Sequence, residues 1–424
     1  MFKKKHPWYR SRGYLHFDSP ISFKKAQSIV MSCDRVAKHS FYPLINYQID
    51  SYKVAKDELG KLQKKVKERP IAYASHVDSH IYAYYAWRLN TSYEQKIQAA
   101  GLNDNVLAFR SLGKSNIEFA DSAFEDIKRR KKCSAVALDV SGFFDNLDHQ
   151  LLKKSWADLI GVDQLPQDHF NVFKSLTRFS SVNKDRLYAI LNISASNPKN
   201  ARHRVCEANV FRDAVRGAGL IDVNRNCFGI PQGSPISALL SNIYMLEFDK
   251  RAKQVMDEQG GSYYRYCDDM LFITTEEYRD DIEHFAQEEI KKLKLSINVK
   301  KTEKRDFWIN AGVQVCNKPL QYLGFTFDGQ RKLLRSAALA RFSNRMKRGV
   351  RLAKATQRKR NAIKRNRGLN ERELYKRKLY ERYSHLGKRN FITYSHRAAD
   401  HMKSDAIRDQ VKPLWTRLER EMSD

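Results

Sequence analysis

The pattern of apolar and polar positions divides this 424-residue chain into three parts. Residues 1–60 combine helix-like and loop-like stretches, with aromatic residues among basic ones. From about 61 to 330, short β-rich runs alternate with helical stretches, which is typical of an α+β unit and not of a regularly alternating parallel sheet. From 331 to 424, apolar residues recur at roughly helical spacing. We therefore expect an N-terminal extension, an α+β unit and an all-helical unit.

Two adjacent carboxylates, Asp268 and Asp269, lie between two apolar runs. Residues 263–266 and 270–273 are rich in β-forming side chains, so they predict a β-hairpin that carries the carboxylates at its tight turn. Neighbouring negative charges repel, and a buried carboxylate without a partner is costly, so the pair favours a divalent cation. Hard oxygen ligands suit Mg²⁺, and nucleotidyl-transfer sites use two such ions roughly 3.5–4 Å apart.

A third carboxylate, Asp139, ends the apolar run 135–138, which predicts a buried strand. We expect Asp139 to be a metal ligand, with the Val140 carbonyl as a further one. Two later aspartates favour structural interpretations: Asp148 as the N-cap of the following helix, and Asp145 as a turn residue.

Phe144, five residues beyond Asp139, has two interpretations. It is either a core aromatic like its neighbour Phe143, or a ring beneath the sugar of an incoming nucleotide, where it would exclude a 2′-hydroxyl. The spacing alone favours the core.

A loop at 229–237 contains two glycines and two prolines, so its backbone can approach a ligand closely. Its position between the two aspartate segments makes it more informative than a glycine-rich loop by itself. We expect a helix over 238–248 and a short hairpin over 321–325. Lys301 lies near the predicted site in sequence order, either as a surface cation or as a proton donor to leaving pyrophosphate.

The formal net charge of +30 indicates a polyanionic partner, and nucleic acid is the default. The alternative is a solvated, highly charged surface, but the charge is uneven: no Asp or Glu occurs between Arg331 and Glu371. Apolar residues at helical spacing predict that one face of this basic segment packs while the other meets phosphates, with steep salt dependence. The alternative is a disordered basic tail. The basic residues expected to contact nucleic acid are Arg345, Lys347, Arg348, Arg351, Arg358, Lys359 and Arg360.

Six scattered cysteines form no CxxC pair, so neither a zinc site nor a disulfide framework is predicted. No apolar run reaches transmembrane length, and no signal-peptide core follows the basic N-terminus. We expect a cytoplasmic protein without a membrane partner.

Taken in order, these segments resemble the successive palm motifs of reverse transcriptases. The matching elements are Asp139 with 143–145, the 229–237 loop, 266–269, Asn298 with 301–302, and 323–325. The segment 67–71 followed by Asp78 resembles a fingers motif, and 108–111 through Ser115 and Ala120 is similar to the next fingers motif of group II intron-type enzymes. The resemblance covers about 65–330. It implies a right-hand polymerase with fingers and palm over 61–330, an antiparallel sheet plus helices, and an all-α basic thumb over 331–424.

The resemblance also implies roles for single residues. Asp139, Asp268 and Asp269 would bind two Mg²⁺ ions, and Lys301 would be the candidate acid. Phe144 would favour dNTPs, and Tyr266 would lie at the nucleotide. Gln232 and Gly233 would contact the nascent pair or the template, whereas Lys67 and Arg69 would clamp the triphosphate. Arg110 and Lys114 would contact nucleic acid.

Within the family, the segments 81–85, 93–94, 109–110 and 115–117 resemble bacterial defence-associated reverse transcriptases of the type-two class. That resemblance implies a structured noncoding RNA as template and a cDNA product that serves defence against phage. Three alternatives stay open: an RNA-dependent RNA polymerase, which Phe144 argues against; a template-independent or protein-primed DNA polymerase of the abortive-infection type; and an RNA-binding scaffold with a vestigial site.

Overall fold

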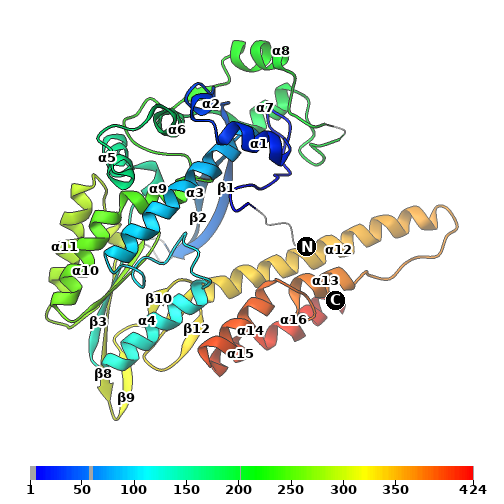
Figure 1. Cartoon of the computed structure of the whole chain (residues 1–424). Helices are drawn as coiled ribbons and strands as arrows, with labels where there is room; N and C mark the ends of the chain where they lie inside the picture. Colours follow the sequence, from blue (N-terminus) through cyan, green and yellow to red (C-terminus); the bar gives the residue numbers. More distant parts are fainter. Residues whose placement is uncertain (1–5, 57–60, 201, 424) are drawn as a thin grey trace, which may run out of the picture.

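The computed structural model describes residues 6–56, 61–200 and 202–423, which form an α+β right-hand polymerase fold (Figure 1). This confirms the fold class predicted from the sequence. The chain builds three sheets, which we call the palm sheet, the fingers sheet and the small sheet, and a group of C-terminal helices.

The palm sheet is five-stranded and antiparallel, with the strand order β6-β7-β3-β8-β9. Val136 and Phe272 on one face join the larger apolar core, while Leu271 and Ile273 on the other face join a core shared with the C-terminal helices. Full burial of a side chain of this size contributes ~1.5–3 kcal/mol, so both faces hold β3 and β7 in place. The strands are β3 (Cys133–Asp139), β6 (Ser262–Tyr266), β7 (Asp269–Thr274), β8 (Glu303–Asn310) and β9 (Val313–Cys316).

Helices cover both faces of the palm sheet. The predicted helix over 238–248 is interrupted at Met245, which separates α9 from α10. Asp148 is the N-cap of α5, as predicted, because its carboxylate accepts from the backbone N–H groups of Gln150 and Leu151. The palm helices are α4 (Asn116–Arg130), α5 (His149–Ile160), α9 (Ser237–Tyr244), α10 (Leu246–Glu258) and α11 (Arg279–Lys292).

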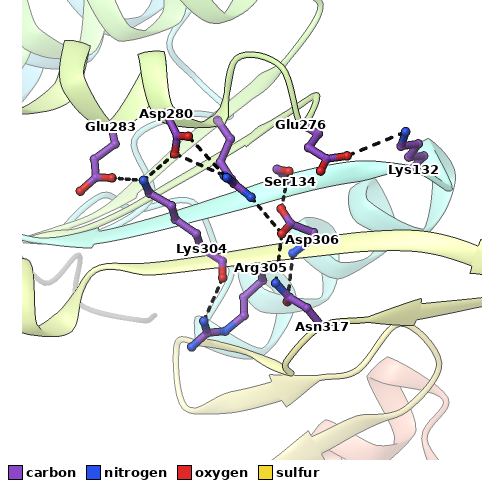
Figure 2. Close-up of polar contacts among 10 residues, drawn as sticks. Lys132, Ser134, Glu276, Asp280, Glu283, Lys304, Arg305, Asp306 and Asn317 are labelled. Atoms are coloured by element: carbon purple, nitrogen blue, oxygen red, sulfur yellow. Dashed lines mark hydrogen bonds and ion pairs between the residues drawn. The ribbon is translucent and has the colours of Figure 1, made fainter.

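A polar network ties α11 to β8 and β3 (Figure 2). Arg279 Nη1 lies 3.0 Å from the Asp306 carboxylate, which also accepts from Ser134 Oγ at 2.6 Å. Lys304 Nζ lies 2.6 Å from Asp280. Single surface pairs contribute little, but a connected set restrains the strand that it spans. The network therefore restrains the position of β8, the strand that begins two residues after Lys301.

The fingers sheet contains a long hairpin that the sequence did not predict. We expected only helix and loop over residues 1–60, yet residues 44–56 form β1, which pairs with β2 from Ile45 opposite Tyr73 to Lys56 opposite Leu62. Ile45, Tyr47 and Ile49 alternate with polar residues, which is the period-two signal of a strand. The boundary expected at residue 60 therefore falls inside a hairpin.

The order of the fingers sheet is β2-β1-β4-β5. Its strands are β1 (Leu44–Lys56), β2 (Leu62–Tyr73), β4 (Ser180–Asn183) and β5 (Asp222–Val223). The surrounding helices are α1 (Phe23–Val30), α2 (Cys33–Ala37), α3 (His76–Ala99), α6 (Gln167–Thr177), α7 (Lys184–Ile190), α8 (Ala208–Val210) and the π-helix Phe211–Gly217.

The C-terminal helices begin with α12, a 30-residue helix that is ~45 Å long. Phe342, Met346 and Val350 bury one stripe of its first half, whereas its second half projects beyond the other helices (Figure 1). The helix predicted for the basic segment is confirmed. The remaining helices are α13 (Arg377–Tyr383), α14 (Phe391–Met402), α15 (Asp405–Val411) and α16 (Pro413–Ser423).

The small sheet joins the palm to α12. Its strands β10 and β11 form the hairpin predicted over 321–325. The strands are β10 (Leu320–Tyr322), β11 (Phe325–Phe327) and β12 (Lys332–Leu334). Among the described helices, none combines the length and the apolar composition needed to cross a bilayer.

Candidate active site

The predicted carboxylate hairpin is present. In it, Tyr266 pairs with Asp269, so Cys267 and Asp268 form the two-residue turn between β6 and β7. Cys267 has φ +60°, as the first central position of one common hairpin turn requires. A side chain in this left-handed region costs on the order of 1–2 kcal/mol, so neighbouring structure has to hold the turn.

Arg265 supports the turn from the protein interior. Its fully buried guanidinium donates to the Cys267 carbonyl at 3.2 Å and to both carboxylate oxygens of Asp249 at 2.6 Å each. Asn242 Oδ1 accepts from it at 3.1 Å, and Tyr263 Oη donates to Asp249 at 2.7 Å. Arg265 was not among the predicted site residues, although an arginine inside a strand-forming run signals a buried acidic partner.

The palm sheet brings the backbones of the three predicted aspartates to the same end of the sheet. Asp139, the last residue of β3, lies directly opposite Asp269, the first residue of β7. The backbone N–H of Val140 donates to the Asp268 carbonyl at 3.2 Å. Asp139 and Asp269, 130 positions apart in the sequence, therefore meet at the same end of the palm sheet.

The negative charges of the three carboxylates repel one another. Loss of hydration, and then repulsion from Asp268 and Asp139, raise the pKa of Asp269 to about 6, although the residue as a whole keeps contact with solvent. Lys301 lies two residues before β8, and its Nζ donates to the Asp139 carboxylate. Lys301 thus lies beside the first carboxylate.

These residues fit a magnesium site by their chemistry. They offer hard oxygen donors, and their mutual repulsion is what a bound cation relieves. In the part of the chain that the structure describes, no three His, Cys, Asp or Glu side chains converge on a common point. The Asp139 carboxylate is bonded to Lys301 in this arrangement.

The glycine-rich loop is joined to the segment after β3. Ile230 N–H donates to the Phe144 carbonyl at 2.9 Å, and Gly229 N–H donates to the Leu147 carbonyl at 2.9 Å. Gly233 has φ +107°, and a Cβ there would lie 2.6 Å from the Ala72 carbonyl of β2. Only glycine permits this contact, which places the loop between the palm and the fingers hairpin.

The structure shows that the neighbouring residues Phe143 and Phe144 differ in burial. Phe143 is 3% exposed and belongs to the core, whereas Phe144 is only partly buried at the edge of that core. Tyr266, just before the carboxylate turn, is half-buried, and burial raises its pKa. Phe144 and Tyr266 are therefore both partly accessible from solvent.

The two residues predicted to bind the triphosphate, Lys67 and Arg69, lie on β2. Arg69 is exposed and pairs in register with Ile49. Lys67 pairs with Ser51, and its side chain lies outside the described residues.

Arg110 does not fit its predicted role in nucleic-acid binding. Its side chain is 1% exposed, and its guanidinium donates to Glu94 at 2.7 Å and to the Val106 carbonyl at 2.9 Å. A buried guanidinium with these partners cannot reach a phosphate, so Arg110 stabilises the loop before α4 instead. Lys114, in the same loop, is exposed.

The basic residues predicted on α12 are mostly free for a ligand. Lys347 differs because its Nζ lies 2.9 Å from a Glu421 carboxylate oxygen on α16. The exposed members of the predicted set are Arg345, Arg348, Arg351, Arg358, Lys359 and Arg360.

Comparison with known families gives one match that covers more than half of the chain. The model of the family described as reverse transcriptase (RNA-dependent DNA polymerase) matches residues 61–327. No curated protein sequence matches the chain.

Several solved telomerase structures are similar in part. Apo telomerase from Candida tropicalis is 12% identical, with a TM-score of 0.41 over 74% of this chain and 54% of that chain. Telomerase from Candida albicans in complex with the TWJ fragment of telomeric RNA is 12% identical, with a TM-score of 0.40 over 76% and 53%. This chain thus spans about half the length of these telomerase chains.

Proposed function

Because the chain belongs to the reverse transcriptase (RNA-dependent DNA polymerase) family, we propose that it copies a structured noncoding RNA into cDNA and acts in bacterial antiphage defence. The observation that carries the polymerase proposal is the strand pairing of Asp139 with Asp269, with Asp268 in the adjoining turn. All three carboxylates lie within the residues that match the family.

Asp139, Asp268 and Asp269, with the Val140 carbonyl, would hold two Mg²⁺ ions, which supply activation of the primer 3′-hydroxyl and neutralise the leaving pyrophosphate. Lys301, now bonded to Asp139, is the proposed proton donor. The chain's own contribution is to position groups and balance charge, since nucleotidyl transfer needs no covalent intermediate with the protein.

We assign the nucleotide to the space bordered by the glycine-rich loop and β2. Phe144 would lie beneath the sugar, Gln232 and Gly233 would border the nascent pair, and Arg69 with Lys67 would meet the triphosphate. The contact of Gly233 with Ala72 supports this assignment, because it brings palm and fingers together there.

We assign the fingers and palm to the residues before about 330, including β1, and the thumb to 331–424. The exposed arginines and lysines of α12 would bind the primer–template duplex through its phosphates. The noncoding RNA and the defence role rest on the sequence resemblance of 81–85, 93–94, 109–110 and 115–117 to defence-associated enzymes.

The test is to purify the protein from a bacterial host with its bound nucleic acid, add labelled dNTPs without a template, and sequence the product. We expect DNA complementary to one co-purified RNA, which is absent when Asp268→Ala/Asp269→Ala replaces the wild type. DNA of random sequence that depends on the same aspartates would replace this proposal with template-independent synthesis.

A further inference from the structure

Asn116, the first residue of α4, joins three parts of the chain that are far apart in sequence. Its Nδ2 donates to the Leu323 carbonyl at 2.9 Å and to the Tyr394 hydroxyl, also at 2.9 Å. An amide nitrogen carries two hydrogens, so both are used. One side chain thereby links the palm helix α4, the turn between β10 and β11, and the C-terminal helix α14.

The turn that Asn116 holds is strained. Its two central residues, Leu323 and Gly324, have φ +47° and +94°. Two-residue turns of this kind favour Asn-Gly, and a leucine at positive φ is an outlier. On the opposite side, Arg335 N–H donates to the Gly324 carbonyl at 3.1 Å, immediately before α12. The turn is therefore restrained from both sides.

Tyr322, next to this turn, packs into the core between the palm sheet and the C-terminal helices. It is 4% exposed, and its hydroxyl has no hydrogen-bond partner among the described residues. Its ring belongs to the same apolar core as Leu271 and Ile273 of β7, the strand that begins at Asp269. Any shift of the turn would therefore disturb the core beneath β7, the strand that carries Asp269.

Tyr394 connects the same turn to the C-terminal helices. Its ring centroid lies 6.3 Å from that of Phe325 on β11 and 6.4 Å from that of Phe391, which stacks at 4.8 Å on Phe342 of α12. The hydrogen bond from Asn116 thus reaches the aromatic cluster on which α12 rests.

We infer that Asn116 is a positioning residue that keeps the β10–β11 turn and the C-terminal helices in register with Asp269, so that the primer end meets the metal site. This inference rests on the proposed polymerase function. It assigns to Asn116 an effect on the primer–template, which the C-terminal helices are proposed to bind, and little effect on the dNTP, which is assigned to the space beside β2.

The experiment measures KM for primer–template, KM for dNTP and product length for Asn116→Ala and Tyr394→Phe. Loss of both donated bonds should raise the primer–template KM roughly five- to tenfold and shorten the products, while the dNTP KM stays within about twofold. Tyr394→Phe removes one acceptor and keeps the ring, so it should raise the primer–template KM roughly two- to fivefold, even where Asn116→Ala folds poorly.

Asn171→Ala is the matched control. Asn171 is also half-buried, and its Nδ2 donates to the Val36 and His39 carbonyls at 2.7 and 2.9 Å, which joins α6 to α2 far from the site. It should cost similar stability and leave both KM values unchanged. Kinetics of Asn116→Ala and Tyr394→Phe that match this control, or equal increases in both KM values, would overturn the inference alone. Absence of DNA synthesis by the wild type would overturn the proposed function and the inference together.

Discussion

At the residue scale, the site is organised around carboxylates that the fold places close together against their mutual repulsion. Asp139 and Asp269 face each other across two paired strands, and the pKa of Asp269 is raised to about 6. Proteins keep such unfavourable charge where a ligand relieves it. Of the two neighbouring phenylalanines, Phe144 is partly accessible and Phe143 is buried, so only Phe144 is available for the proposed contact with the sugar.

Asp269→Asn should stabilise the metal-free protein at pH 8. An unfolded aspartate has a pKa near ~3.9, so the penalty for the folded carboxylate is absent below about pH 4, grows up to about pH 6 and is complete above it. After allowance for solvent screening, we expect ~1 kcal/mol. Thermal unfolding at pH 4 and pH 8 measures this. Mg²⁺ should raise the midpoint of the wild type only, and a lower midpoint for the variant at pH 8 would contradict the assignment.

Phe144→Ala should increase incorporation of ribonucleotides, because the ring proposed to block the 2′-hydroxyl is removed. The measurement is the ratio of kcat/KM values for dNTP and the matching rNTP, and we expect it to fall about 10-fold or more, the discrimination that one apolar contact supplies. Phe143→Leu serves as the core control and should leave the ratio unchanged. An unchanged ratio for Phe144→Ala would return this ring to a packing role.

At the element scale, the β6–β7 hairpin depends on α10 for its shape. The turn has a strained Cys267, and the Arg265–Asp249 pair beneath it connects the hairpin to that helix. A local sequence pattern can form a hairpin, but the Arg265–Asp249 ion pair sets the orientation of its turn relative to α10.

Arg265→Met should therefore lower the free energy of unfolding by about 3–5 kcal/mol, since it leaves the buried Asp249 carboxylate without its partner. Urea unfolding measures this loss. The double variant Arg265→Met/Asp249→Leu should recover much of the stability without recovering activity, because the Cys267 carbonyl still lacks its donor. Recovery of both would show that the pair does not position the turn.

At the scale of the whole molecule, the carboxylate cluster and the exposed basic residues of α12 occupy different parts of the chain. The carboxylates lie at one end of the palm sheet. Helix α12, which carries the exposed cations, extends away from that sheet (Figure 1). The projecting half of α12 extends the positive surface well beyond the site.

Replacement of Arg351, Arg358 and Lys359 by Gln should weaken RNA binding and reduce the slope of log K against log salt by roughly 0.7–0.9 for each phosphate that is no longer neutralised. Binding titrations at several salt concentrations measure it. Lys24→Gln/Lys25→Gln on α1 is the control for charge alone, and Asp268→Asn should abolish synthesis with binding nearly intact. An equal change in slope for the α1 control would argue against a specific role for α12.

The sequence by itself determined the features that depend on neighbours along the chain. The carboxylate hairpin, the strand that ends at Asp139, the cap at Asp148 and the helical basic segment follow from local periodicity and charge. These patterns act over a few residues, so they can be recognised without the fold.

Only the tertiary structure decided which distant residues meet. It placed Asp139 opposite Asp269, paired β1 with β2, and buried Arg110 on Glu94, an ion pair that charge alone did not indicate. It also joined Asn116 to Leu323 and Tyr394, 207 and 278 positions away. Partners at such separations are selected by the packing of whole elements, because the free energy that fixes them comes from surfaces buried far from either residue in the chain.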